Sequence, residues 1–127
     1  MKYLLDTHTL IWLSERSPKL SMRTKELFVD RKNSIYVCSA SLWEIAIKVR
    51  LGKLKLRSTF RELLNHVENS DFEMLQIEND YLEKLSVLPF IHRDPFDRLL
   101  IATALSEGLT IITTDDNIQR YDVPCIW

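Results

Sequence analysis

The chain has 127 residues and a net charge of −1, with 46% hydrophobic and 28% charged residues. These values describe an ordinary globular protein that is large enough to bury a core, so we expect a single domain over residues 1–127. No apolar run reaches the length of a membrane span, and Asp6 comes too early for a signal peptide. The composition therefore predicts a cytoplasmic protein without a membrane segment.

Short apolar strands and helices alternate along the chain. In chain order, the sequence predicts a strand over 2–5, helices over 7–14 and 21–32, a strand over 34–38, a helix from 39 or 41 to 51, a helix over 59–68, a strand over 72–77, helices over 79–88 and 94–107, a strand over 109–113, a helical turn over 116–120 and an edge strand over 123–126. This alternation is typical of a parallel sheet covered on both faces. We therefore expect an α/β fold of three layers, αβα, around a central, mostly parallel sheet of four to five strands.

Acidic residues follow the predicted strands or begin the helices that come after them. These acids are Asp6, Glu44, Asp94, Asp97, Asp115 and Asp116. In a parallel sheet such positions meet at the carboxyl edge, where ligands bind. A purely structural interpretation is also open, because Asp6, Asp94 and Asp115 can be helix caps. Ser41 and Glu44 likewise have the spacing of a capping box. Since Ser, Thr or Asn would cap equally well, the repeated use of an acid favours a shared site.

A cluster of carboxylates is unstable unless a cation lies among them. Two like charges about 4 Å apart repel by about 1 kcal/mol in water and by up to about 4 kcal/mol at an effective dielectric constant near 20. Mg²⁺ and Mn²⁺ bind carboxylate oxygens and retain several waters, which suits phosphate chemistry. With only two glycines, the chain contains neither a P-loop nor a dinucleotide-binding fingerprint, and it has no Gly-x-Ser-x-Gly motif.

Basic residues are concentrated in the first half of the chain. Residues 1–61 contain 13 of the 17 Lys and Arg side chains but only 5 of the 18 acids. Between Ile45 and Phe60 there is no acid and there are five basic residues: Lys48, Arg50, Lys53, Lys55 and Arg57. Such a stretch attracts phosphate groups, although a solvated helix end is an equally open interpretation. For Lys48 the alternative is an ion pair with Glu44, one helical turn earlier.

Four acidic motifs occur in order along the chain. They are LDTHTLIW at 5–12, SASLWEIAIK at 39–48 continued by LGKL at 51–54, HRDPFDRLLIA at 92–102, and TTD at 113–115. Together they resemble the PIN-domain nucleases, in particular the VapC-type toxins of bacterial toxin–antitoxin pairs, over essentially the whole chain. The resemblance implies a PIN-like fold and a Mg²⁺- or Mn²⁺-dependent endoribonuclease that hydrolyses RNA phosphodiester bonds with metal-activated water.

The resemblance also assigns roles to residues by their position in the motifs. The catalytic and metal-binding acids would be Asp6, Glu44, Asp97 and Asp115. Asp94 would cap its helix, with direct metal contact as the alternative. The supporting residues would be Thr7, Thr113 and Asp116. The residues that contact RNA would be Lys48, Arg50, Lys53 and Arg98. As partners, the family implies an RNA substrate, a small cognate antitoxin protein and a second copy of the chain in a homodimer.

Two other classes of protein share some of these features. A receiver-like phosphoacceptor domain is also a small α/β protein with acids and Mg²⁺, but it needs a lysine after a late strand, where this chain has Thr113, Thr114 and Asp115. A nuclease-like module that only binds RNA or a protein partner would not need intact acids. Incubation of the protein with RNA and Mn²⁺ separates the second alternative from an enzyme.

Overall fold

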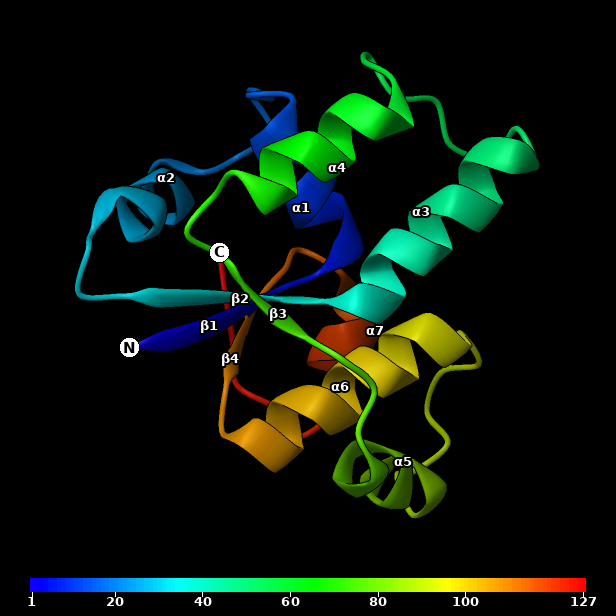
Figure 1. The fold of residues 1–127 in the computed structure, drawn as a ribbon. Coiled ribbons are helices and arrows are strands. Elements are labelled where there is room, and N and C mark those ends of the chain that lie inside the picture. Colours follow the sequence, from blue (N-terminus) through cyan, green and yellow to red (C-terminus); the bar gives the residue numbers. More distant parts are fainter.

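Five short strands form one parallel sheet that is covered by helices on both faces (Figure 1). The computed structural model describes residues 1–127. Its elements are β1 (Lys2–Leu5), α1 (Thr7–Ser14), α2 (Met22–Val29), β2 (Ser34–Cys38), α3 (Ser39–Arg50), α4 (Phe60–Glu68), β3 (Glu73–Leu75), α5 (Asn79–Ser86), α6 (Pro95–Glu107), β4 (Thr110–Ile112), α7 (Asp116–Gln119) and β5 (Cys125–Ile126). The strand order is β3-β2-β1-β4-β5, and every neighbouring pair is parallel. The predicted three-layer α/β fold is confirmed.

The sheet has a hydrophobic core on each face because successive strand side chains point in opposite directions. Leu4 of β1 belongs to the core beneath α5, α6 and α7, whereas its neighbours Tyr3 and Leu5 belong to the core beneath α1, α3 and α4. All three side chains are buried. In Figure 1 these two groups of helices lie on opposite sides of the strands. Burial on both faces explains why the central strand β1 is apolar from Tyr3 to Leu5.

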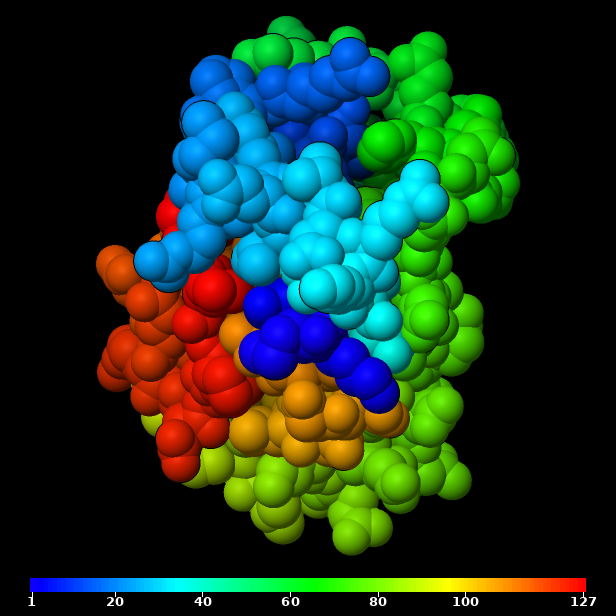
Figure 2. All heavy atoms as spheres, turned by 90° about the vertical axis from the view of Figure 1, so that its left-hand side faces the viewer, coloured from blue at the N-terminus to red at the C-terminus, as the bar shows by residue number.

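The carboxyl ends of the strands all lie at the same edge of the sheet. Leu5 pairs with Ile112, so the residues that follow β1 and β4 begin side by side. Figure 2 views the opposite edge, where the N-terminal residues lie between the segment that starts β2 and the segment around α6 and β4. The central position of β1 therefore places Asp6 between the ends of β2 and β4.

Several predicted boundaries differ from the structure by one to three residues. The helix predicted over 21–32 ends at Val29, because Asp30 adopts an extended conformation and its carboxylate accepts the Lys32 amide hydrogen at 2.9 Å. The strand predicted over 72–77 pairs only from Glu73 to Leu75. Neither segment contains any of the six acids predicted at the carboxyl edge of the sheet. No helix combines the length and the apolar composition needed to cross a membrane.

Candidate active site

Asp6 connects the end of β1 with the start of α1 and the end of β4. It is the N-cap of α1, since its Oδ1 accepts the Thr9 amide hydrogen at 2.7 Å. Its Oδ2 accepts a hydrogen bond from the Thr113 hydroxyl, and Thr113 directly follows β4. Burial raises the pKa of Asp6, although both hydrogen bonds oppose that shift. The residue is therefore a helix cap and, at the same time, a carboxylate at the carboxyl edge of the sheet.

Glu44 lies in the second turn of α3 and points toward α1. Its Oε1 accepts a hydrogen bond from the Thr7 hydroxyl at 2.6 Å, and its Oε2 accepts one from Lys48 Nζ at 2.5 Å. The capping box predicted for Ser41 and Glu44 is wrong. The chain passes from β2 into α3 without a loop, so Cys38 is the N-cap and Ser41 already lies inside the helix. Glu44 is thus free to pair with Thr7 and Lys48.

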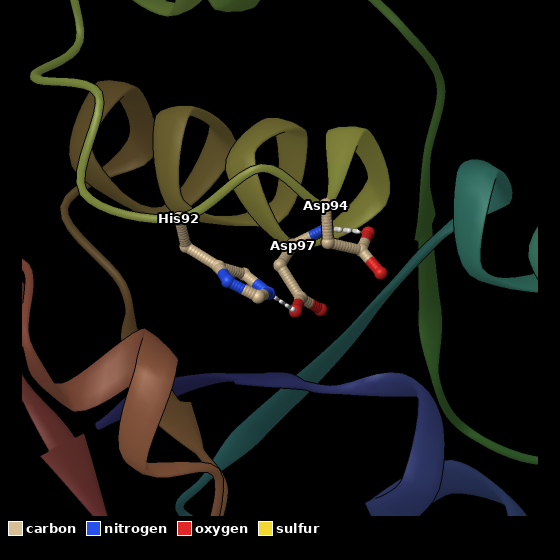
Figure 3. A group of neighbouring side chains, drawn as sticks. All are labelled: His92, Asp94 and Asp97. Carbon is tan, nitrogen blue, oxygen red and sulfur yellow. Dashed lines mark hydrogen bonds and ion pairs between the residues drawn. The ribbon is translucent and has the colours of Figure 1, made fainter.

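The start of α6 brings three polar side chains together. Asp94 is the N-cap, with Oδ1 accepting the Phe96 and Asp97 amide hydrogens at 2.9 and 3.1 Å, and Pro95 occupies the first turn as predicted. Asp97 turns toward His92, whose Nε2 lies 3.3 Å from Asp97 Oδ2 (Figure 3). One ligand atom from each of His92, Asp94 and Asp97 lies within 4.8 Å of the others.

Asp115 is the N-cap of the short helix α7. Its Oδ1 accepts the Asn117 amide hydrogen at 2.9 Å, and its own amide donates to the Thr113 hydroxyl oxygen at 2.9 Å. Asp116, the next residue, is exposed and does not line the acidic pocket described below. Asp115 is therefore the member of this pair that faces the other acids.

These side chains form one wholly polar pocket of about 190 Å³, here called the acidic pocket. Its lining residues are Asp6, Thr7, His8, Glu44, Lys48, His92, Asp94, Asp97 and Asp115. The structure thus brings together all four acids predicted to be catalytic, together with Asp94. Burial raises the pKa of Asp97 to about 7, and the nearby charges of the other four acids add to the increase.

The donor set of the acidic pocket fits a divalent cation. The Asp97 carboxylate accepts no hydrogen bond from a hydroxyl or a backbone amide, and it lies among four other carboxylates. A hard cation with carboxylate oxygens as ligands relieves this repulsion. The imidazole of His92 lies close enough to Asp94 and Asp97 to offer a nitrogen to the same ion.

The predicted RNA-binding residues fall into two groups. Lys48 lines the acidic pocket, Lys53 lies beside it, and Arg50 is exposed on the last turn of α3. The RNA contact predicted for Arg98 is inconsistent with the structure, which buries this side chain. Its guanidinium donates to the Leu88 and Pro89 carbonyl oxygens and to the Tyr121 hydroxyl.

The position of Arg98 has a simple geometric cause. Consecutive residues of an α-helix point about 100° apart, so Arg98 cannot share the direction of Asp97. It turns instead toward the segment between α5 and α6, where it also lies 4.7 Å from the centre of the Phe90 ring. Arg98 therefore holds that segment against α6 and does not line the acidic pocket.

His92 is a site residue that sequence reasoning missed. Histidine spacing along the chain gives no metal motif, and His92 looks like a surface residue. The only available signal was its place two residues ahead of the helix cap Asp94, within the third acidic motif. The Tyr121 hydroxyl accepts the His92 amide hydrogen at 2.9 Å and so helps to fix that place.

The fold and the acidic pocket define the class of protein: the chain belongs to the PIN domain family, whose model matches residues 3–124. It is 26% identical over 126 residues to ribonuclease VapC22 from Mycobacterium tuberculosis, covering 95% of this chain and 92% of that protein. The structure of VapBC2 from Rickettsia felis bound to a DNA fragment from their promoter has a TM-score of 0.75 at 19% identity, covering 99% of this chain and 98% of that chain. The structure of VapBC-5 from Mycobacterium tuberculosis, a member of the VapBC family of toxin-antitoxin systems, has a TM-score of 0.64 at 20% identity. The match covers 98% of this chain and 97% of that chain.

These comparisons confirm the resemblance read from the four motifs. They also argue against the receiver-like alternative, because the match to the PIN domain extends over nearly the whole chain.

Proposed function

We propose that this protein is a divalent-metal-dependent endoribonuclease that hydrolyses RNA phosphodiester bonds. The observation that carries the proposal is the convergence of five acids from four separate segments in one wholly polar pocket. Membership of the PIN domain family and the likeness to a protein named as a ribonuclease support it. A set of helix caps alone would have no reason to place its carboxylates against one another.

In this proposal Asp6, Glu44, Asp97 and Asp115 hold Mg²⁺ or Mn²⁺, and Asp94 and His92 stand beside them. When bound, such an ion activates water for attack on phosphorus and stabilises the charge on the leaving oxygen. The side chains around the acids have positioning roles. Thr113 and the Thr9 amide orient Asp6, while Thr7 and Lys48 orient Glu44.

We further propose that the protein is the toxin of a toxin–antitoxin pair, acts in the cytoplasm and forms a homodimer. The names of its relatives support a small antitoxin partner. Three large apolar side chains on α3 and around the end of α5 are more than half exposed, namely Trp43, Val87 and Phe90. Exposed apolar side chains are available for contact with another protein chain, and a dimer that buries them would support this part of the proposal.

The test is cleavage of a labelled structured RNA by the purified protein with Mn²⁺, Mg²⁺ or EDTA. We expect metal-dependent cleavage by the parent and a loss of about 100-fold or more in Asp97→Asn and Asp6→Asn. Asp116→Asn is the matched control, because it removes an acid that lies next to the site in sequence but outside the acidic pocket. Circular dichroism checks that each variant is folded.

Two outcomes would contradict the proposal. Full activity in Asp97→Asn would remove the acidic pocket from the reaction. A parent protein that binds RNA with Mn²⁺ but never cleaves it would instead be the RNA-binding module considered above.

A further inference from the structure

A second pocket adjoins the acidic pocket and opens beside α1 and the C-terminal end of α3. It has a volume of about 260 Å³, and we call it the adjoining pocket. It shares four residues with the acidic pocket, Thr7, His8, Glu44 and Lys48, and extends from them to Ile11, Lys53 and Leu54. The two pockets are therefore neighbouring parts of one surface that meet at the Glu44–Lys48 ion pair.

The chain builds the adjoining pocket by folding back at the end of α3. Gly52 adopts a φ of +72°, which permits the reversal at little steric cost. The amides of Lys53 and Leu54 then both donate to the Lys48 carbonyl oxygen, at 2.9 and 3.2 Å. Leu54 packs against the core beneath α1, α3 and α4, where Ile11 is buried. These contacts fix the walls of the pocket.

The lining of the adjoining pocket combines positive charge with apolar surface. Lys48 and Lys53 contribute two ammonium groups, and the exposed imidazole of His8 lies at the border with the acidic pocket. Ile11 and Leu54 provide the apolar contacts. A cavity of about 150 Å³ accommodates benzene, so 260 Å³ has room for a ribose or a nucleobase.

The charge difference between the two pockets suits a nucleic acid strand. The acidic pocket repels phosphates unless it holds a cation. In the lining of the adjoining pocket, Glu44 pairs with Lys48, so the charge of Lys53 makes the lining positive overall, and a positive lining attracts phosphates. A strand whose scissile phosphate lies at the acids must place a neighbouring nucleotide within a few ångströms. The adjoining pocket offers matching chemistry directly beside the acids, because it shares four lining residues with the acidic pocket.

We propose that the adjoining pocket binds the RNA nucleotide next to the scissile phosphate, with its phosphate at Lys53 and Lys48 and its ribose or base against Ile11 and Leu54. This assignment rests on the proposed ribonuclease function and specifies where that function gains its preference for nucleotides near the cut. Lys48 has two roles in it, since the same ammonium group that orients Glu44 also faces the nucleotide.

The first test compares two lysines on the same loop. Lys53 lines the adjoining pocket, and Lys55, two residues later, is exposed and does not. In an Asp97→Asn background, we measure the affinity for a labelled single-stranded RNA at several salt concentrations.

We expect Lys53→Ala to weaken binding by about 5- to 10-fold. The slope of log affinity against log salt concentration should fall by about one, because one phosphate contact is lost. We expect Lys55→Ala to change the affinity by less than about two-fold. Equal losses in the two variants would mean that only the overall positive charge matters, which would overturn the assignment.

The second test changes the shape of the adjoining pocket. Leu54→Trp narrows it, and Leu51→Trp adds the same side chain at an exposed position outside it. Sequencing of cleaved RNA ends should show an altered preference for the nucleotide next to the cut in Leu54→Trp and an unchanged preference in Leu51→Trp. Thermal unfolding verifies that both variants fold, and the Lys53 and Lys55 pair provides the test that does not disturb the core.

These experiments separate failure of the assignment from failure of the proposed function. If the parent cleaves RNA but the lysine variants do not differ, the pocket assignment is wrong and the ribonuclease proposal stands. If the parent cleaves no RNA, the ribonuclease proposal fails, and the assignment that rests on it fails as well.

Discussion

The acidic pocket holds its carboxylates differently on its two sides. On the side formed by β1 and α3, every carboxylate oxygen of Asp6 and Glu44 accepts a hydrogen bond from a hydroxyl, an amide or an ammonium group. On the side formed by α6, the Asp97 carboxylate has only the contact with His92, at 3.3 Å. Burial and four neighbouring acids raise the pKa of Asp97 to about 7.

This difference separates carboxylates that the folded chain stabilises with its own hydrogen-bond donors from a carboxylate that only a proton or a bound ion can stabilise. The donors around Asp6 and Glu44 hold those side chains in place in the folded chain. Asp97 has no comparable donor, so a proton or a divalent cation has its largest effect there. We therefore expect substitutions on the two sides to change stability in opposite directions.

The largest expected effect is stabilisation of the parent protein by Mn²⁺. An ion that binds only the folded state adds about 2.7 kcal/mol to the free energy of unfolding at 100 times its Kd. Thermal unfolding with Mn²⁺ and with EDTA measures this gain. We expect the gain to fall by more than half in Asp97→Asn and to be retained in Asp116→Asn. An equal gain in the two variants would place the ion away from α6.

The next effect is the pH dependence of stability without metal. The folded-state pKa of Asp97, about 7, lies above its ordinary value of 3.8, so between these values the folded chain binds more protons than the unfolded chain. The free energy of unfolding of the parent therefore falls as pH rises through this range.

Asp97→Asn removes that dependence. Above about pH 7 it should be more stable than the parent by about 2 kcal/mol, a value reduced from the full shift to allow for solvent screening. Near pH 4 the two proteins should be closely similar. Denaturant unfolding at both pH values measures this, with Asp116→Asn as control. If the free energy of unfolding of the parent instead rises from about pH 4 to about pH 7, the ionised Asp97 carboxylate does not destabilise the folded chain, which contradicts this prediction.

The smallest effect concerns the opposite side of the acidic pocket. Thr113→Val leaves the buried Oδ2 of Asp6 without its hydroxyl donor, so we expect a loss of about 1–2 kcal/mol in the free energy of unfolding. Thr103→Val is the control, because Thr103 is equally buried but donates only to the Leu99 carbonyl within its own helix. We expect it to cost less than half as much. Equal losses would show that the Thr113 hydroxyl has no special role in holding Asp6.

Much of the local structure follows from short segments of the sequence. Asp94 followed by Pro95 predicts the start of α6, and the structure has the predicted cap and first turn. The apolar runs predict the strands, and acids directly after them predict the edge at which the acids meet. These predictions succeed because capping and alternation depend on residues only a few positions apart.

The sequence by itself thus determined the order of the elements, the parallel sheet and the acids at its carboxyl edge. Tertiary structure decided which donor holds each carboxylate, that Arg98 turns inward, that His92 reaches Asp97, and that Lys53 and Leu54 complete a pocket beside the acids. The Thr7–Glu44 hydrogen bond joins residues 37 positions apart, and the Thr113–Asp6 bond joins residues 107 positions apart. Such contacts exist only once α1 packs against α3 and β1 pairs with β4, so no short segment of the chain encodes them.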